Sequence, residues 1–165
     1  MEYPIIFYVH LCFNWGLQKT GVTSYLSKIL ALVIGQNIML GALVLLFLVG
    51  ILSSVVPNIP LVVAMVPLLK EYLVNINLAS PDILNPDFSG HLPPEVLPLF
   101  YAMMFGATLG GNGTLVGASS NIVAAGVSEQ HGQPISFKTF LKYGFPVMAM
   151  QLVVSALYVV IFLLR

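Results

Sequence analysis

The sequence contains very few charged residues. Only 7% of its 165 residues are Asp, Glu, Lys or Arg, while 58% are hydrophobic. Soluble domains carry roughly 25% charged residues. So little charge would not cover the surface of a soluble protein of this size. The composition therefore predicts an integral membrane protein whose main surroundings are the lipid bilayer.

Several other features are missing. The formal net charge is zero and the basic residues are scattered, which excludes a phosphate-binding surface for nucleic acid. A single cysteine excludes an internal disulfide framework and a cysteine-cluster metal site. No Ser–His–Asp, His-x-x-x-His or paired-carboxylate arrangement lies within reach of the apolar segments. We therefore expect no enzyme activity and no cofactor.

Long charge-free runs set the expected topology, which is an all-α polytopic (multi-pass) membrane protein. Residues 29–69 contain no charge, and at about 1.5 Å per helical residue this run crosses a bilayer roughly twice. Residues 96–128 and 143–164 are also charge-free. We expect a partial transmembrane helix over 1–17, an interfacial helix over 18–31, a re-entrant hairpin over 35–74, an aqueous loop over 75–97, a broken transmembrane helix over 98–131, and a connector with the last transmembrane helix over 136–165. Ser136 is the expected N-cap of this connector.

The predicted hairpin turns at Pro57-Asn58-Ile59-Pro60. Two prolines three residues apart interrupt a helix, because each lacks an N–H and restricts the residue before it. A turn that leaves the membrane usually carries charge, and this one carries none. The pattern favours a re-entrant hairpin whose tip stays at membrane depth. The alternative is two full spans joined by an uncharged external turn.

The predicted broken helix contains a polar, glycine-rich stretch from Gly110 to Asn121. Irregular backbone at membrane depth survives only inside protein or beside a water-filled cavity, because hydrocarbon cannot hydrogen-bond it. Secondary transporters place substrate and coupling ions at such breaks. An alternative is a small-residue helix-packing face of the Gly113-x-x-x-Gly117 kind. The candidate ion- or substrate-binding residues of the break are Gly111, Asn112, Gly113, Thr114, Ser119, Ser120 and Asn121.

The hairpin tip adds Ser54 and Asn58 to the candidate site. Neutral side-chain oxygens and freed carbonyls suit a hard cation, so Asn58 and Thr114 are candidate Na⁺ contacts. The N-terminus of the half-helix after the break suits an anion. Asn58 also fits an ordinary turn-capping residue. Glu129 and His131 are a candidate proton relay, with an interfacial polar cap as the alternative.

These motifs resemble the ion-transporter superfamily, which includes arsenite permeases, sodium–proton antiporters, citrate-transporter-like permeases and P protein. The resemblance rests on Gly110-Gly-Asn-Gly-Thr-Leu-Val-Gly-Ala-Ser-Ser-Asn121, on Ser53 with Asn58-Ile59-Pro60, and on the segment 16–21. Many arsenite-permease and P-protein-like members have an acidic residue directly before Asn-Ile-Pro. Here that residue is Pro57, so the tip lacks the carboxylate that could bind a cation or proton in those members.

The resemblance implies an elevator-type secondary transporter built from two inverted repeats. It would move an anion such as arsenite, a carboxylate or another oxyanion, or exchange Na⁺ for H⁺. We expect this chain to supply the second, C-terminal repeat, with the missing N-terminal repeat as its partner and a homodimer as the full-length assembly. The coupling ion would be Na⁺ or H⁺. The alternative is a non-transporting membrane subunit or assembly factor whose helix breaks serve only packing.

Overall fold

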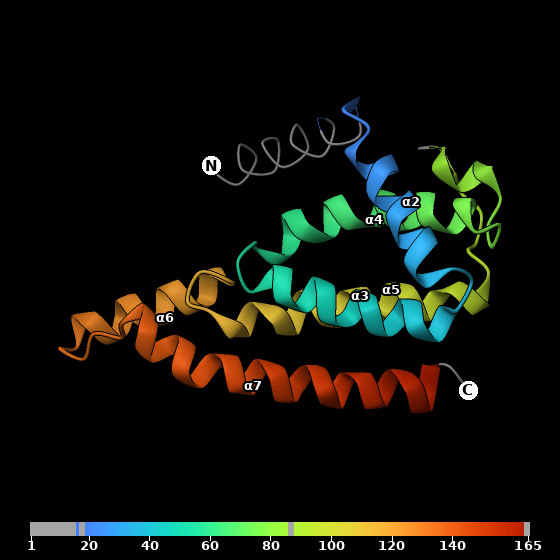
Figure 1. Ribbon diagram of the computed structural model, residues 1–165. Coiled ribbons are helices and arrows are strands. Elements are labelled where there is room, and N and C mark those ends of the chain that lie inside the picture. The colour runs from blue at the N-terminus through green and yellow to red at the C-terminus, as the bar shows by residue number, and fades with distance from the viewer. Residues whose placement is uncertain (1–15, 17–18, 86–87, 164–165) are drawn as a thin grey trace.

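The computed structural model describes residue 16 and residues 19–85 and 88–163. This part of the chain is helical and contains no strand, which confirms the expected all-α class there (Figure 1). The partial helix predicted over 1–17 lies outside the described residues except for Gly16. The α-helices are α2 (Val22–Ile34), α3 (Ile38–Ser53), α4 (Asn58–Asn75), α5 (Leu97–Gly110), α6 (Ser119–Gln130) and α7 (Phe137–Tyr158). Short turns are η1 (Pro81–Leu84), η2 (Pro94–Val96), η3 (Gly111–Gly113) and the π-turn η4 (Val159–Leu163).

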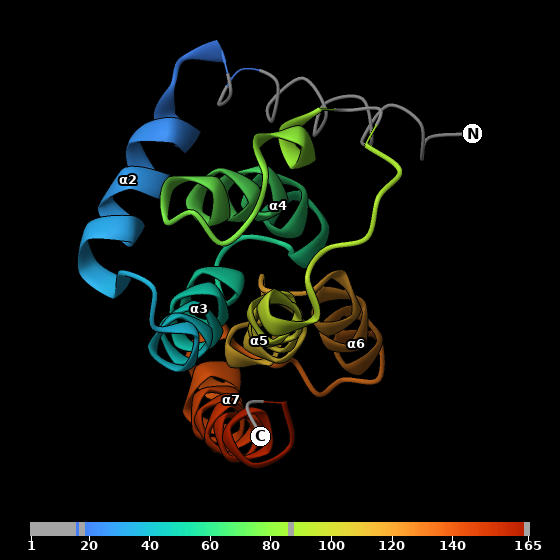
Figure 2. The same ribbon diagram turned by 90° about the vertical axis from the view of Figure 1, so that its right-hand side faces the viewer.

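Helices α3, α4, α5 and α7 lie side by side with similar axis directions, and α2 crosses one side of this bundle (Figures 1 and 2). Helices α3 and α5 approach most closely, because glycines stand where they cross. A Cβ added to Gly106 would lie 2.5 Å from the carbonyl oxygen of Leu46, and one on Gly110 would overlap the backbone of Gly50. The small residues therefore permit backbone-to-backbone packing between two otherwise apolar helices.

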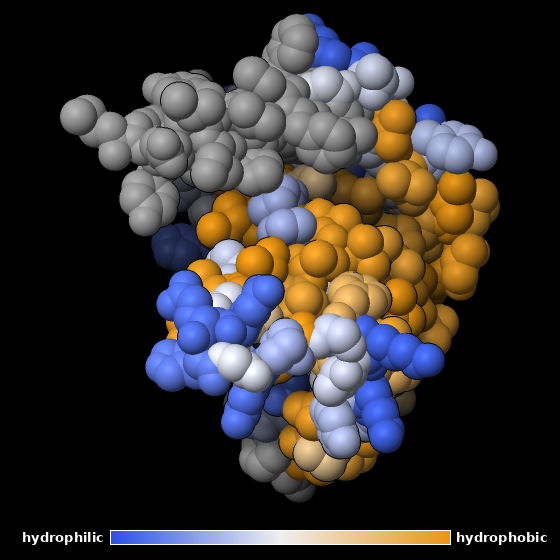
Figure 3. Space-filling model, turned by 90° about the vertical axis from the view of Figure 1, so that its left-hand side faces the viewer, coloured by the Kyte–Doolittle hydropathy of each residue, from blue (hydrophilic) through white to orange (hydrophobic). Residues whose placement is uncertain are grey.

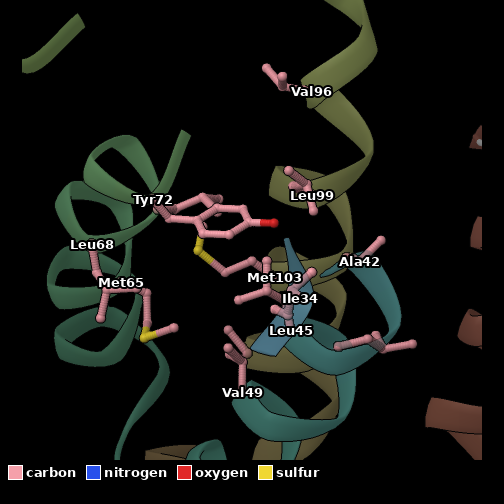
Figure 4. Close-up of a cluster of buried hydrophobic side chains, with 14 of the residues drawn as sticks. Ile34, Ala42, Leu45, Val49, Met65, Leu68, Tyr72, Val96, Leu99 and Met103 are labelled. Carbon is pink, nitrogen blue, oxygen red and sulfur yellow. The ribbon is translucent and has the colours of Figure 1, made fainter. Parts of the chain in front are cut away.

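Buried side chains fill the space between α3, α4 and α5. Tyr72 reaches from α4 toward Leu99 and Met103 of α5, and Leu45 and Val49 of α3 close the cluster (Figure 4). The Tyr72 hydroxyl also donates a 2.8 Å hydrogen bond to the carbonyl oxygen of Gly35. This bond ties the turn between α2 and α3 to α4, which fixes how the hairpin is attached.

Helix α2 exposes most of its apolar side chains and buries some of its polar ones. Of the apolar residues that predict the interfacial helix, Val22, Tyr25, Leu26 and Ile29 are exposed, Tyr25 to 67%, while Leu30 packs against the core. In contrast, Thr23 and Ser27 are buried, and Ser27 contacts α4. An apolar exterior with a polar interior suits a helix surrounded by lipid rather than by water.

On the face seen in Figure 3, apolar side chains cover the centre and hydrophilic side chains gather toward the lower end. Many large hydrophobic side chains of the described residues are exposed. One helix in the described part, Phe137–Ile161, is long and apolar enough to cross a membrane by length and composition, and only 17% of its most apolar window is buried. The expected connector and last span form one uninterrupted helix. Ser136 accepts a hydrogen bond from the Thr139 N–H at 3.1 Å, which confirms it as the N-cap.

Candidate functional site

The hairpin tip is a tight turn of four residues. Helix α3 ends at Ser53 and α4 begins at Asn58. Pro57 immediately precedes α4 with φ −55° and ψ 145°, an extended conformation that its ring favours. Pro60 lies in the first turn of α4, where the missing N–H has no helical partner to lose. The two prolines thus define where one arm stops and the next begins.

The break in the second element is wider. Helix α5 ends at Gly110, η3 follows, and the chain is extended at Thr114 (φ −135°, ψ 164°) and again at Ala118 (φ −142°, ψ 141°) before α6 starts. Because the chain is not helical between them, Gly113 and Gly117 do not share one helical face. The alternative of a Gly-x-x-x-Gly helix face is therefore wrong for this pair.

Both glycines instead make room for other parts of the site. A Cβ on Gly113 would overlap the sulfur of Met148 in α7 and lie 3.2 Å from the Cβ of Ser54. A Cβ on Gly117 would lie 2.6 Å from the carbonyl oxygen of Gly111 and 3.0 Å from that of Ser54. Close packing thus brings the backbone of the break directly against the hairpin tip.

A threonine hydroxyl connects the tip to the break. The Thr114 hydroxyl donates a short hydrogen bond to the carbonyl oxygen of Ser54, across 60 residues of sequence. It accepts one from the Gly117 N–H at 3.1 Å. Thr114 is only 7% exposed, so these bonds satisfy backbone groups that the break and the turn leave without helical partners.

Ser53 and Asn58 form a second connection. The Ser53 hydroxyl has a single hydrogen, which it directs between the Asn58 Oδ1 at 2.8 Å and the carbonyl oxygen of Ala107 in α5 at 2.5 Å. The Asn58 Oδ1 also lies against Gly111, 3.0 Å from where a Cβ would stand. The tip amide therefore reaches the start of the break. Ser53 belongs to the motif that carries the resemblance but is not among the predicted contacts, and Ala107 is not singled out by any motif.

Asn121 closes the break from the α6 side. Its side-chain amide donates to the carbonyl oxygens of Gly111 and Thr114, both at 3.0 Å. Both amide hydrogens are thereby used, and the side-chain oxygen has no hydrogen-bond partner among the described residues. This oxygen is available to a ligand that needs an acceptor or a cation ligand.

Other predicted site residues lie apart from this group. Asn112 turns toward α7 and donates to the Gln151 side chain at 2.9 Å. Ser119 and Ser120 are exposed in the first turn of α6. The hydroxyl of Ser54 bonds back to the carbonyl oxygen of Ile51 at 2.6 Å, so Ser54 contributes its backbone carbonyl rather than its side chain.

The candidate proton relay also lies apart. Glu129 and His131 are exposed at the far end of α6, about 15 Å from its first turn by helical rise. The His131 Nδ1 lies 2.8 Å from the carbonyl oxygen of Val127 in the same helix. Both side chains therefore lie at a helix end away from the tip and break, and the relay and the interfacial polar cap both stay predictions.

The chemistry of the tip and break is that of neutral oxygens. The group consists of carbonyl oxygens of the turn and break, the hydroxyl groups of Ser53 and Thr114, and the amides of Asn58 and Asn121. No group of three or more His, Cys, Asp or Glu side chains able to hold a metal ion occurs among the residues described. Neutral oxygens in a partly enclosed setting suit a weakly held monovalent cation or an anion bound through N–H and O–H donors.

The fold and the site define the class first: an all-helical protein with the apolar exterior of a membrane protein and polar groups gathered at a hairpin tip and a helix break. A family model described as "Citrate transporter" (CitMHS) matches residues 2–85. The chain belongs to this citrate transporter family, a family of transporters rather than enzymes. No solved structure matches the chain.

Named relatives agree with this assignment. An uncharacterized transporter of Synechocystis sp. is 71% identical over 156 residues, which cover 94% of this chain and 35% of that protein. The P protein of Mus musculus is 45% identical over 121 residues, covering 73% of this chain and 13% of that protein. An uncharacterized transporter of Mycobacterium tuberculosis is 33% identical over 155 residues, covering 93% and 33%. The chain thus spans about a third of the length of these two transporters.

Proposed function

We propose that this chain carries half of the ion-binding site of a multi-pass, elevator-type secondary transporter. The observation that supports this proposal is the contact between the hairpin tip and the helix break, joined by the bond from Thr114 to the Ser54 carbonyl oxygen. The turn between α3 and α4 meets the break between α5 and α6. Backbone groups that a continuous helix would pair within itself are thereby brought together. Transporters bind substrate and coupling ions with such groups near the midplane of the bilayer.

In this proposal the two arms α3 and α4 form a re-entrant hairpin. Helix α3 has 16 residues and is apolar throughout, which is shorter than the roughly 20 residues of a full span. At about 1.5 Å per residue this arm is about 24 Å long, so its tip stays inside a hydrocarbon core of roughly 30 Å when the arm starts at the membrane surface. The matching half of the site comes from an inverted repeat elsewhere in the protein, and two copies of the transporter form the dimer.

The proposed cation at this site is Na⁺, with the Asn58 and Asn121 side-chain oxygens and the Thr114 hydroxyl as its contacts. Thr114 retains an unused lone pair after its two hydrogen bonds. The proposed substrate is an anion such as a carboxylate, arsenite or another oxyanion. It lies at the N-terminus of α6, where the first-turn N–H groups of Ser119 and Ser120 and the helix dipole favour negative charge. Exchange of Na⁺ for H⁺ is the other proposed transport mode; because these neutral oxygens do not bind a proton near neutral pH, it would need a proton-binding group outside the tip and break.

The test uses the full-length gene product in proteoliposomes. Uptake of citrate, phosphate, arsenite and Na⁺ is measured for Asn58→Ala and Asn121→Ala, with Gln130→Ala, an exposed amide at the end of α6, as the matched control. Both asparagine variants are expected to lose most of the uptake that the wild type shows, and the control to retain it. If both asparagine variants transport every one of these ions at the wild-type rate, the site assignment is wrong.

A further inference from the structure

A second group of polar side chains lies between α2 and α4. Its members are Thr23 and Ser27 on α2 and Glu71 and Asn75 on α4, and we call it the α2–α4 cluster. Glu71 and Asn75 are one helical turn apart near the end of α4. Asn58, which begins the same helix, is 13 residues from Glu71, or about 20 Å by helical rise. The cluster is therefore separate from the tip and break.

Ser27 lies at the centre of this cluster. It is 0% exposed and accepts a 3.0 Å hydrogen bond from the Asn75 side-chain amide. Its hydroxyl has one hydrogen and two acceptors within reach, the Ser24 carbonyl oxygen at 2.9 Å and the Glu71 Oε2 at 3.4 Å. Because the Ser24 oxygen is closer, the Glu71 carboxylate receives at most a long, weak bond.

The Glu71 carboxylate has few other interaction partners. It is half-buried, and across the described ranges its only hydrogen bond or ion pair is the contact with Ser27. Lys28 and Lys70 are each adjacent in sequence to a cluster residue, but a neighbouring position on a helix points roughly 100° away. Within the described part of the chain, the Glu71 carboxylate therefore has one long contact and no adjacent cation.

Thr23 supplies an independent observation. It is 3% exposed, and its hydroxyl oxygen is buried without a hydrogen-bond partner. Thr23 precedes Ser27 by four residues, so both lie on the same face of α2, one turn apart. Buried polar groups nearly always have a partner, and a bound ion is one explanation for an exception.

We propose that the α2–α4 cluster binds one Na⁺ ion, separately from any ion at the tip and break. The Glu71 carboxylate, the Thr23 and Ser27 hydroxyl groups and the Asn75 amide oxygen are the ligands that a hard cation prefers. One carboxylate balances one positive charge, whereas calcium sites usually gather several. The ion would satisfy both the unpaired Thr23 oxygen and the poorly paired Glu71, and it would fasten α2 to the hairpin arm. This inference goes beyond the proposed function and does not depend on it.

The test measures equilibrium binding of radioactive Na⁺ to the full-length gene product in detergent, with choline keeping the ionic strength constant. All variants are made in an Asn58→Ala background to remove the tip contact. Glu71→Gln and Thr23→Val are each expected to weaken Na⁺ binding about tenfold or more. Glu95→Gln, which changes an exposed carboxylate in η2, is expected to leave it unchanged.

Thr23→Val separates this inference from a purely structural role of the cluster. If Thr23 is only an unpaired buried hydroxyl, valine raises the unfolding temperature in the absence of Na⁺ and leaves Na⁺ binding intact. If Thr23 is a ligand, binding weakens. This variant also decides the question should Glu71→Gln fail to fold.

The result that overturns the inference is Na⁺ binding that is absent in the Asn58→Ala background, or that is unaffected by both cluster variants. The first of these outcomes, combined with Na⁺ binding by the wild type, would leave the tip site as the Na⁺ site. Both sites would be supported if the cluster variants lose Na⁺ binding and if Asn58→Ala alone loses ion uptake. The two proposals therefore fail separately.

Discussion

At the scale of single residues, the Thr114 hydroxyl is the group on which the contact between tip and break depends most directly. Thr114→Val keeps the shape of the side chain but leaves the Ser54 carbonyl oxygen without its partner, while the Gly117 N–H keeps only its 3.3 Å bond to the backbone carbonyl oxygen of residue 114. Each unsatisfied buried group costs about 1–3 kcal/mol. We expect a clear fall in the unfolding temperature of the detergent-solubilised protein, together with reduced uptake.

The matched variant is Thr114→Ser, which keeps the hydroxyl and removes only a methyl group. It is expected to retain most of the stability and transport that valine loses. Equal losses in the two variants would mean that the methyl group, and not the hydrogen bonds, is what Thr114 contributes.

Patterns at the level of residues predict where the tip and the break fall along the chain, but not which of their groups bond to each other. The glycine-rich stretch and the two prolines mark the break and the tip because they act through local backbone geometry. The role of Ser54 could not be predicted, since it contributes a carbonyl oxygen to a residue 60 positions away. Likewise, Asn112 and Asn121 look alike in sequence, and only packing decides that one faces Gln151 and the other the break.

At the scale of helices, the crossing of α3 and α5 sets the position of the tip against the break. Gly110→Ala places a methyl group into the backbone of Gly50 and must move the two helices apart. Overpacking of this kind costs about 1–3 kcal/mol. We expect a lower unfolding temperature and weaker ion-dependent stabilisation, because the shift displaces η3 and Gly111 as well.

The same substitution at Gly126 is the control for this prediction. Gly126 lies inside α6, and nothing stands within 4 Å of an added Cβ. Alanine there is expected to be neutral or to stabilise the helix by about 0.5–1 kcal/mol. A large destabilisation at Gly126 with none at Gly110 would contradict the close crossing of α3 and α5.

Helix α2 shows why helices are easier to locate than to orient. Its apolar periodicity predicted a helix, and the structure has one at Val22–Ile34. The pattern alone does not say whether the apolar face meets the protein or the lipid. In this chain the apolar face is outward and Thr23 and Ser27 are inside, because the bundle presents polar groups of α4 to that side.

At the scale of the whole molecule, the apolar exterior and the family assignment support the same environment. The exposed surface includes large hydrophobic side chains along most of α7, such as Met150 and Val154 at 63% and 59% exposure. Exposed apolar area of this extent on a soluble monomer would drive association. In a bilayer the same surface is the favoured one, and the polar groups of the tip and break are the part that needs shelter.

A charge placed on this exterior tests the environment directly. Met150 lies near the middle of the apolar helix Phe137–Ile161 and is 63% exposed, so if this helix spans the membrane, Met150→Lys puts an ammonium group near the centre of the bilayer. Such a residue costs about 3 kcal/mol in membrane insertion. Phe137→Lys, at the first residue of the same helix, costs little because its side chain reaches the headgroup region.

The readout is the fraction of protein that resists alkaline extraction from membranes, with the yield of folded protein in detergent as a second measure. We expect Met150→Lys to lower both strongly and Phe137→Lys to leave both near the wild-type level. In a water-exposed helix the two substitutions would be equally harmless, because surface changes of this kind rarely exceed about 0.5 kcal/mol. Equal behaviour of the two variants would therefore mean that α7 does not span the bilayer, and that the proposed transport site does not lie at membrane depth.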